Sequence, residues 1–341
     1  MIDMRHLRYL IAASLGGAML GIAVWQAAAQ QAPNPFPLAA PAGRDSNARA
    51  VAPPGAVNQG PFNMSAWKYG SAFNAPAGTK IWNPAKIKLM QGGKLIGGTV
   101  LAVNDPSTYC AMANAGYDFT WTEMQHSPSE WDAVARAWRT CPNAKAVPGV
   151  RIAYTNEQQI QHALDSGALV LVVPTVDTVE EAREVVHWAY FPPMGGRSLG
   201  GGVAFDPNMW GNVPGGYRNT INDNLVVIVM IETLEGLKNA DEIAKVPGIS
   251  AVFAASSDLG NFSGFKQGDP DYERAINIVH DATIKAGKRL CGPLAWKDRP
   301  DFTCFQAGNE IAAIARGVKA ELGDLANTQP KPEVGPFASA R

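Results

Sequence analysis

The sequence predicts an α/β protein of the (β/α)8 TIM-barrel class, and two observations carry that prediction. From about residue 94 to 322, short apolar runs rich in β-branched residues alternate with segments of helical periodicity. Roughly eight strand–helix units within roughly 230 residues is the count and length of such a barrel. A doubly wound open sheet is the alternative. Against it, no predicted strand runs directly into a G-x-G-x-x-G turn, and the glycine cluster at 195–202 follows a helix.

The predicted strands are apolar runs with many Val, Ile and aromatic residues, at 95–102, 117–123, 146–154, 169–173, 225–231, 251–255, 288–292 and 311–315. Between them lie helical segments, of which the clearest occupy 105–116, 127–138, 156–167 and 178–189. Each of these four opens with Asp, Ser, Asn or Thr, the residues that cap helix N-termini, and the first and third end in Gly.

The first 29 residues are expected to be an export signal. Arg5 and Arg8 precede a long uncharged stretch, and Ala27 and Ala29 fit a small-x-small cleavage pattern. The alternative is a retained membrane anchor, because about 20 apolar residues can span a bilayer. We therefore expect an exported protein, periplasmic or secreted, that has no contact with the membrane once the signal is cleaved.

The rest of the chain is expected to divide into three parts. Residues 30–79 are rich in Pro, Ala and Gly without hydrophobic periodicity, which indicates a disordered arm. Residues 80–325 carry the barrel pattern, and 326–341 read as a flexible tail. The content of 46% hydrophobic and 17% charged residues suits a substantial core, and the net charge of −1 argues against sequence-independent nucleic-acid binding.

The four cysteines do not form a metal or redox motif. None has C-x-x-C spacing, and export would allow them to oxidise in any of three pairings. Structural disulfides or buried thiols are the expected roles of Cys110, Cys141, Cys291 and Cys304.

Polar residues gather where four predicted strands end. Glu232 follows the fifth strand directly, and Asp258 follows the sixth. Glu123 and His126 stand at and after the end of the second strand, and Arg151 lies near the end of the third. Each has an ordinary structural explanation as a helix cap, an ion-pair partner or a surface side chain. Together they lie on the face where barrel enzymes place their chemistry, which favours a functional site.

The types of these residues predict the chemistry. Two carboxylates without a nearby cysteine or second histidine suit Mg²⁺ or Mn²⁺. A cation, an arginine and a histidine together suit proton abstraction beside the carbonyl of a 2-keto acid. A Schiff-base mechanism would need a lysine at a strand end. The lysines near strands stand at strand starts, and Lys297, further into a loop, is the exception.

Several motifs, in order, resemble the HpcH/HpaI aldolases, which are class II, metal-dependent enzymes that act on pyruvate. The resemblance covers about residues 83–325 and includes AGYDFTWTEMQHSP, VRIAYTNEQQIQHALDSGALVLVVPTVDTVEEA, YFPPMGGRSLG, VMIETLEGLKNADEIAKVPGI and VFAASSDLG. It implies a barrel that assembles as a hexamer, a trimer of dimers. It also implies reversible cleavage of 4-hydroxy-2-keto acids to pyruvate, or a near relative, and an aldehyde, with Mg²⁺, Mn²⁺ or Co²⁺.

The resemblance also assigns roles to single residues. Glu232 and Asp258 match the metal ligands, and Arg151 matches the arginine that holds the keto oxygen and stabilises the enolate. His126 matches an acid–base histidine, and Asp165 matches an aspartate that pairs with it. Because Asp165 follows a helix, at the opposite end of its own barrel, that pairing is expected across a subunit interface.

The chain departs from the family pattern around this site. Glu123 stands where Asp is usual, and Met230 replaces a frequent Gln. Ser256 and Ser257 replace residues of a loop whose backbone N–H groups help hold the substrate carboxylate, so both are expected to contact substrate. Trp121 is expected as part of an aromatic wall of the pocket together with a second tryptophan, Trp210, or else as a core residue.

These departures keep other functions open. One alternative is an exported barrel that binds keto acids without turning them over. Others are oxaloacetate decarboxylation and cleavage of CoA thioesters. The balanced charge, the export and the absence of a phosphate-cradling loop argue against CoA.

Overall fold

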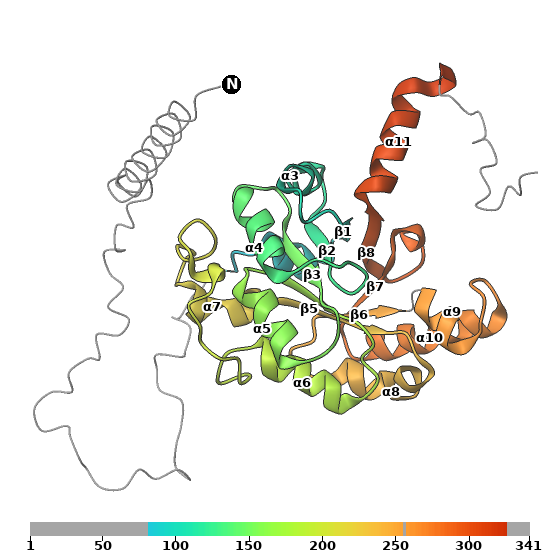
Figure 1. Ribbon diagram of the computed structural model, residues 1–341. Helices are drawn as coiled ribbons and strands as arrows, with labels where there is room; N and C mark the ends of the chain where they lie inside the picture. The colour runs from blue at the N-terminus through green and yellow to red at the C-terminus, as the bar shows by residue number, and fades with distance from the viewer. Residues whose placement is uncertain (1–80, 255–256, 326–341) are drawn as a thin grey trace, which may run out of the picture. The chain divides into compact units, whose positions relative to one another are not determined.

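The computed structural model describes residues 81–254 and 257–325. The expected signal (1–29), the expected disordered arm (30–79) and the expected tail (326–341) lie outside the described residues. Eight parallel strands close into one barrel in chain order, which confirms the predicted fold class (Figure 1). They are β1 Leu95–Val100, β2 Phe119–Glu123, β3 Val147–Arg151, β4 Val170–Val173, β5 Val226–Ile231, β6 Ala251–Ala254, β7 Arg289–Pro293 and β8 Phe302–Asn309.

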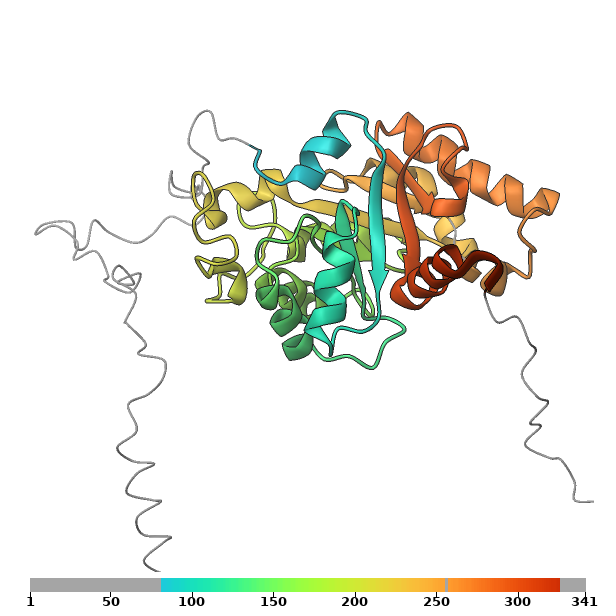
Figure 2. The same cartoon turned by 90° about the horizontal axis from the view of Figure 1, so that it is seen from above.

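Helices surround this barrel. Figure 2 shows α2 (Pro84–Met90) at the end of the barrel where β1 begins. The helices that follow are α3 Pro106–Asn114, α4 Trp131–Thr140, α5 Glu157–Asp165, α6 Val179–Ala189, α7 Tyr217–Asn224, α8 Leu234–Lys245, α9 Ser257–Ser263, α10 Pro270–Lys285 and α11 Glu310–Leu322. Short 3₁₀ turns lie at η3 Val203–Phe205, η4 Leu294–Trp296 and η5 Gly323–Leu325.

Side-chain caps start three of the four clearest predicted helices where the sequence predicts them. Asp105 and Asn156 accept backbone N–H groups from the first turns of α3 and α5. Thr178 and Glu181 form a reciprocal capping box at the start of α6. Each such cap contributes about 1 kcal/mol to helix stability. All four predicted helices are present, but α4 begins at Trp131 without a side-chain cap, so the expected cap at Ser127 was wrong.

The prediction for the eighth strand was wrong. Residues 311–315 lie inside α11, and β8 is formed instead by Phe302–Asn309. The reason is local propensity: IAAIA contains three alanines, which favour helix, and Asn309 caps it by accepting the N–H of Ala312. The true strand, FTCFQAGN, holds the aromatic and β-branched residues that strands favour. Between β7 and β8 the chain makes the 3₁₀ turn η4 and no α-helix.

The barrel interior is packed with aromatic side chains. The ring of Trp121 on β2 meets the ring of Phe253 on β6, with centroids 5.7 Å apart. Strands β2 and β6 are diametrically opposite in an eight-stranded barrel, so the two rings meet through its interior. The ring of Phe119 packs beside Trp121. Gly97 makes room for the Phe119 ring, because a Cβ at Gly97 would lie 2.4 Å from it.

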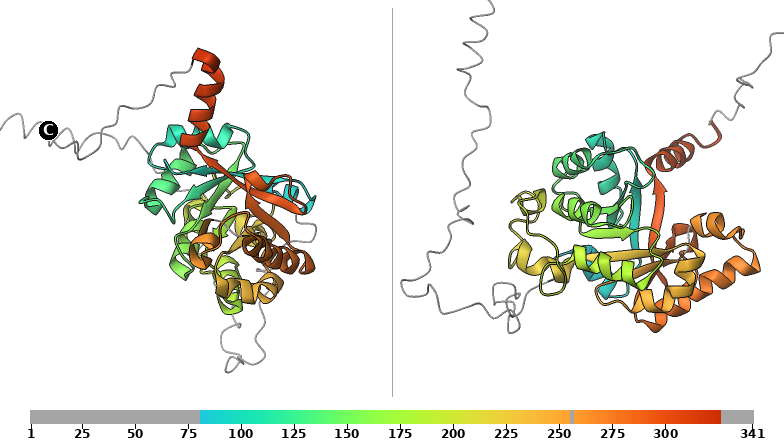
Figure 3. Two further views of the ribbon diagram at one scale, coloured as in Figure 1. Left: turned by 90° about the vertical axis from the view of Figure 1, so that its right-hand side faces the viewer. Right: turned by 60° about the horizontal axis from the view of Figure 1, so that its bottom comes forward.

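Helix α11 leaves the barrel instead of packing on it (Figures 1 and 3). Of its residues only Glu310 is buried. Apolar side chains recur at helical spacing along it, and Ile311, Ile314 and Val318 are 66%, 61% and 46% exposed. An exposed apolar stripe of this kind marks a surface that packs against something else.

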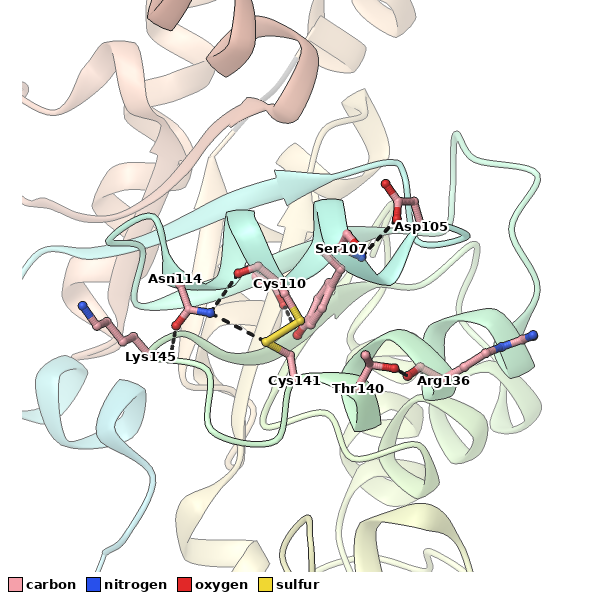
Figure 4. Close-up of a disulfide and its surroundings, with 10 residues drawn as sticks. Asp105, Ser107, Cys110, Asn114, Arg136, Thr140, Cys141 and Lys145 are labelled. Atoms are coloured by element: carbon pink, nitrogen blue, oxygen red, sulfur yellow. Dashed lines mark hydrogen bonds between the residues drawn. A yellow bond between two sulfur atoms is a disulfide. The ribbon is translucent and has the colours of Figure 1, made fainter. Parts of the chain in front are cut away.

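One disulfide joins Cys110 on α3 to Cys141 at the end of α4 (Figure 4). Cys291 and Cys304 are buried free thiols on the neighbouring strands β7 and β8. Burial is the first cause that raises the pKa of the Cys291 thiol, and its contact with Cys304 adds to it. Within the described residues, no helix has the length and apolar character needed to cross a bilayer.

Candidate active site

A buried ion pair stands where β2 and β3 end. Glu123 and Arg151 are register partners as the last residues of their strands. Oε2 of Glu123 accepts hydrogen bonds from Nε of Arg151 at 2.7 Å and contacts Nη2 at 2.6 Å. Their side chains are only 2% and 8% exposed. One edge of the guanidinium is therefore fixed by the carboxylate, and the pair stays rigid at the mouth of the barrel.

The other oxygen of Glu123 holds the loop after β2. Oε1 accepts the backbone N–H groups of Gln125 at 2.8 Å and His126 at 3.1 Å. The His126 residue itself is exposed. Glu123 thus ties the arginine to the loop that carries the histidine, which places two predicted catalytic residues on one carboxylate.

A second buried carboxylate follows β5. Glu232 is 1% exposed, and its Oε1 accepts the backbone N–H of Thr175 at 2.9 Å and the Thr175 hydroxyl at 3.0 Å. Thr175 has φ 49°, an unfavourable conformation for a β-branched residue. Strain of this kind is typical of functional sites. Here it directs both donors of one residue onto one carboxylate oxygen.

The loops that carry these two residues are joined a second time. Thr233, the residue after Glu232, donates its hydroxyl to Oδ1 of Asp177 at 2.5 Å and also caps α8 by accepting the N–H of Gly236. Two sets of hydrogen bonds, from Thr175 to Glu232 and from Thr233 to Asp177, therefore join the β4–α6 and β5–α8 loops.

The remaining predicted metal ligand, Asp258, follows β6, the neighbour of β5. It is the second residue of α9 and is half-buried, and Ser257 beside it is exposed. Ser256 lies outside the described residues. Among the residues that the structure describes, no three His, Cys, Asp or Glu side chains gather as a metal-binding group. Carboxylate oxygens, such as those of Glu232 and Asp258, are the ligand type that suits a hard dication whose other positions are taken by water and substrate.

Asp165 lies at the end of α5 and makes an ion pair with Arg197, Oδ1 to Nη2, at 2.7 Å. Arg197 is fully buried, and its guanidinium also donates to the Tyr217 hydroxyl at 3.2 Å and lies 4.5 Å from the Phe191 ring centroid. Burial lowers the pKa of Arg197, but its contacts with Tyr217 and Asp165 outweigh this and raise it. Within one chain Asp165 anchors the loop that carries Arg197. The expected pairing of Asp165 with His126 of another subunit stays a prediction.

Trp121 lies in the barrel interior, two residues before Glu123 on the same face of β2. This makes it part of the core directly below the ion pair. Lys297, the one lysine that sequence left open, accepts a hydrogen bond on its backbone oxygen from Lys94, which precedes β1. The backbone of Lys297 therefore lies toward the opposite end of the barrel from Glu232.

Sequence reasoning missed three residues of this region. Thr175 could have been found, because it is a polar residue two positions past the end of a strand. Glu310 follows β8, and its carboxylate accepts the backbone N–H groups of Leu101 and Ala102 beyond β1. It was overlooked because the eighth strand was misplaced. Arg197 gave no signal, because it lies in a glycine-rich segment that follows a helix and not at the end of a predicted strand.

Buried acidic and guanidinium groups at the C-terminal ends of parallel barrel strands are the arrangement that (β/α)8 enzymes use for their active sites. Comparison with known proteins gives the family. The profile of the HpcH/HpaI aldolase/citrate lyase family matches residues 99–320. The chain therefore belongs to the HpcH/HpaI aldolase/citrate lyase family.

Individual relatives agree with this assignment. The chain is 33% identical over 236 residues to a 2-keto-3-deoxy-L-rhamnonate aldolase of Klebsiella pneumoniae, covering 68% of this chain and 86% of that one. It is 32% identical over 267 residues to a hydroxypyruvate/pyruvate aldolase of Delftia acidovorans, covering 74% and 96%. A crystal structure of a family member from Burkholderia cenocepacia J2315 matches with a TM-score of 0.63 and 26% identity, over 71% of this chain and 98% of that one. The protein is thus a carbon–carbon lyase of the divalent-metal-dependent aldolase type.

Proposed function

We propose that this enzyme cleaves and forms 4-hydroxy-2-keto acids through the enolate of pyruvate or a close analogue. The supporting observation is the buried Glu123–Arg151 pair. Glu123 occupies the Nε edge of the guanidinium, and in this proposal a remaining N–H group of Arg151 donates to a substrate oxygen. An enolate oxygen at that position is stabilised by a fixed positive charge in a water-poor site.

The remaining steps are assigned to the two carboxylates, which would bind the metal ion, and to His126. Glu232 and Asp258 would hold a divalent ion, which supplies Lewis-acid polarisation of the keto acid when bound. His126, exposed at the mouth on the loop held by Glu123, moves the proton of the 4-hydroxyl group during cleavage and returns it during synthesis. We propose Mg²⁺ or Mn²⁺ as the ion, with Co²⁺ as a substitute, because the two ligands are carboxylates.

The substrate class has support from the relatives. The Klebsiella protein is named for a 2-keto-3-deoxy sugar acid, and the Delftia protein for hydroxypyruvate and pyruvate. A 2-keto acid is the chemistry that these names share. We propose a 2-keto acid and an aldehyde as the small-molecule substrates of this chain.

Proton exchange tests this function. With Mg²⁺, Mn²⁺ or Co²⁺ present, the protein is expected to exchange the methyl protons of pyruvate in deuterated water, followed by NMR. Exchange should fall about 10²- to 10³-fold in Arg151→Ala and persist in Arg136→Ala, where the arginine is exposed on α4. Absence of exchange with all three metals contradicts the proposal. Keto-acid binding without exchange, or without aldehyde release from hydroxy-keto acids, identifies a non-catalytic binding barrel instead.

We also propose that the protein is exported, to the periplasm or outside the cell. The Cys110–Cys141 disulfide supports this, because disulfides persist in oxidising compartments. N-terminal sequencing of the protein from a periplasmic or culture fraction should begin near residue 30. A chain that stays in the cytoplasmic fraction with residue 1 intact contradicts export, and a full-length chain in the membrane fraction indicates a retained anchor.

We propose in addition that the chain forms a homo-oligomer through α11, with a hexamer built from dimers as the expected state. The exposed stripe of Ile311, Ile314 and Val318 supports a packing partner. Light scattering should give a multiple of the chain mass, and Ile311→Glu with Ile314→Glu should lower it. A monomer at all concentrations contradicts the proposal.

A further inference from the structure

A small pocket with aromatic walls opens at the end of the barrel where the strands begin, opposite the candidate active site. Val147 and Pro148, the first residues of β3, line it, and so does Pro84, the exposed first residue of α2. Its larger side chains are those of Tyr109, Trp138, Met209 and Trp210. Its volume is about 170 Å³. An apolar cavity of about 150 Å³ holds a benzene ring, so this pocket has room for one aromatic side chain.

The polar atoms of the three aromatic walls are already paired elsewhere. The Tyr109 hydroxyl and the Trp138 N–H are hydrogen-bonded to threonine hydroxyls of β2, each at 3.3 Å. The Trp210 N–H donates to the backbone oxygen of Gly167 at 2.8 Å. Lys145 also lines the pocket but is exposed, so its ammonium group can stay in water. The pocket therefore favours an apolar ring over a polar or charged group.

Two fixed contacts hold the walls of this pocket. The disulfide between Cys110 and Cys141 joins α3 to the end of α4, the two helices that carry the Tyr109 and Trp138 walls (Figure 4). On the other side, the rings of Trp82 and Trp210 are stacked with their centroids 5.7 Å apart. Because the walls are held in place, an occupant meets a preformed pocket and pays little to organise it.

The chain enters the described residues at the rim of this pocket. Ile81 is the first of them, the next residue stacks on the Trp210 wall, and Pro84 lines the pocket itself. The 20 sequence positions before Ile81 hold four aromatic residues, which are Phe62, Trp67, Tyr69 and Phe73. The 30 positions before those hold one, Phe36. Segments that pack against nothing are poor in aromatic residues, so this concentration next to the barrel indicates a packing partner.

Of the four aromatic residues, Phe73 suits the pocket best. It is the nearest to the barrel in sequence, and the eight residue steps from it to Ile81 span up to about 26–29 Å. Its ring carries no polar atom. The Tyr69 hydroxyl and the Trp67 N–H would each need a hydrogen-bond partner when buried, and the paired walls offer none.

We infer that the segment 67–73 docks on its own barrel, with the Phe73 ring in the pocket between Tyr109, Trp138 and Trp210. Burial of one ring stabilises the docked state, and the ordering of the segment offsets part of that gain. The short connection to Ile81 favours binding within one chain, because it keeps the segment at a high effective concentration near the pocket. Docking at this end leaves the mouth of the barrel open. The expectation of a disordered arm then applies to residues 30–66.

Trypsin tests this docking, because the segment contains one of its cleavage sites. Cleavage of a reversibly docked segment follows the fraction that is released. The purified protein with residues 30–80 present is digested briefly, and mass spectrometry gives the cleavage rates after Lys68 and after Arg49. A synthetic peptide of residues 40–80, which contains both bonds, supplies the reference ratio. Cleavage after Lys68 is expected to be about 10-fold slower, relative to that ratio, in the protein.

Two variants of the segment show whether the ring is responsible. Phe73→Ala leaves the barrel sequence unchanged and should restore the ratio of the peptide. Phe36→Ala removes the same ring far from the barrel and should keep the protection. A wild-type ratio equal to that of the peptide, or protection that survives Phe73→Ala, overturns the inference.

A second pair of variants tests the pocket. Ala144 is half-buried in its lining, so Ala144→Phe fills the space without removing a wall and should abolish the protection. Ala135→Phe is the control, because Ala135 is also half-buried but lies on α4 outside this pocket. Protection that survives in folded Ala144→Phe, or is lost equally in both variants, places the segment elsewhere. Protection that falls on dilution shows that a second copy supplies the segment, which overturns docking within one chain.

Discussion

Two buried glutamates stand at the same end of the barrel and are held by different kinds of donor. Glu123 faces a guanidinium, so the charge of Arg151 offsets its own. Glu232 accepts from the N–H and hydroxyl of Thr175, which orient an oxygen without adding positive charge. Under the proposed function, the first arrangement positions the cationic side chain of Arg151 toward the substrate. The second is the way proteins orient a carboxylate that ligates a metal ion.

The largest expected effect comes from Glu232→Gln. The amide oxygen can still accept from Thr175, so the melting temperature should stay close to that of the wild type. Metal content should be lost, and pyruvate exchange should fall about 10²- to 10³-fold, the size expected when charge stabilisation is removed. Elemental analysis of the purified protein and NMR exchange measure both.

Glu310→Gln is the matched control, because Glu310 is also a buried glutamate at this end that accepts backbone N–H groups, but it is not a proposed metal ligand. Its metal content should equal that of the wild type. A Glu232→Gln variant with the metal content of the wild type would show that Glu232 differs from Glu310 in no way that concerns the metal.

Glu123→Gln should have the opposite effects: stability falls and the bound metal is retained. It breaks a buried ion pair and leaves the Arg151 charge uncompensated, which is expected to lower the free energy of unfolding by about 3–5 kcal/mol. The bound metal should be retained. Urea denaturation, read beside metal content, separates this outcome from that of Glu232→Gln.

Asp132→Asn is the control for Glu123→Gln. It breaks the exposed Asp132–Arg136 pair, whose side chains are 76% and 64% exposed. The expected loss there is below about 1 kcal/mol. Equal losses of unfolding free energy in the two variants would show that the Glu123–Arg151 pair contributes no more to stability than an exposed ion pair.

A smaller effect is expected from Thr175→Ala. The variant removes the hydroxyl that orients Glu232 but keeps the backbone N–H, so metal affinity should fall about 10-fold, as when a group that orients a metal ligand is removed. Thr175→Ser keeps the hydroxyl and should bind metal like the wild type. Titration with Mn²⁺ compares them, and equal affinities in both variants would remove Thr175 from the site.

The barrel and the location of the candidate site could be predicted from the sequence, because both predictions depend on local patterns of residues. Alternating apolar runs identify seven of the strands, and polar residues at or directly after their ends include Arg151 and Glu232. The eighth strand was missed because FTCFQAGN is interrupted by polar residues, whereas IAAIA is uniformly apolar. Periodicity over five residues does not distinguish a strand from an alanine-rich helix turn.

The donors around the two glutamates could not be predicted, because they depend on contacts between separate loops. Thr175 reaches Glu232 across 57 positions of the chain. Its φ of 49° is a property of the folded loop, and no propensity of threonine predicts it. In the same way, the sequence shows that Glu123 is one methylene longer than Asp, but only the structure shows that its Oε2 meets Arg151.

The smallest expected effect concerns His280 and the two aspartates that contact it, a partly exposed cluster in contrast to the buried Glu123–Arg151 pair. On α10, Nδ1 of His280 contacts Asp281 at 2.8 Å and Nε2 contacts Asp301 at 3.0 Å. The hydrogen bond to Asp281 raises the pKa of His280, partial burial opposes this, and Asp301 adds to the rise. Because the folded-state pKa is the higher one, the stabilisation is complete below about pH 6.5 and is lost as pH rises through the folded-state pKa. The melting temperature of the wild type should therefore exceed that of His280→Gln by about 1–2 °C more at pH 6 than at pH 9, the scale of a surface pair. A constant difference across that range would mean that the histidine contacts these aspartates without gaining charge.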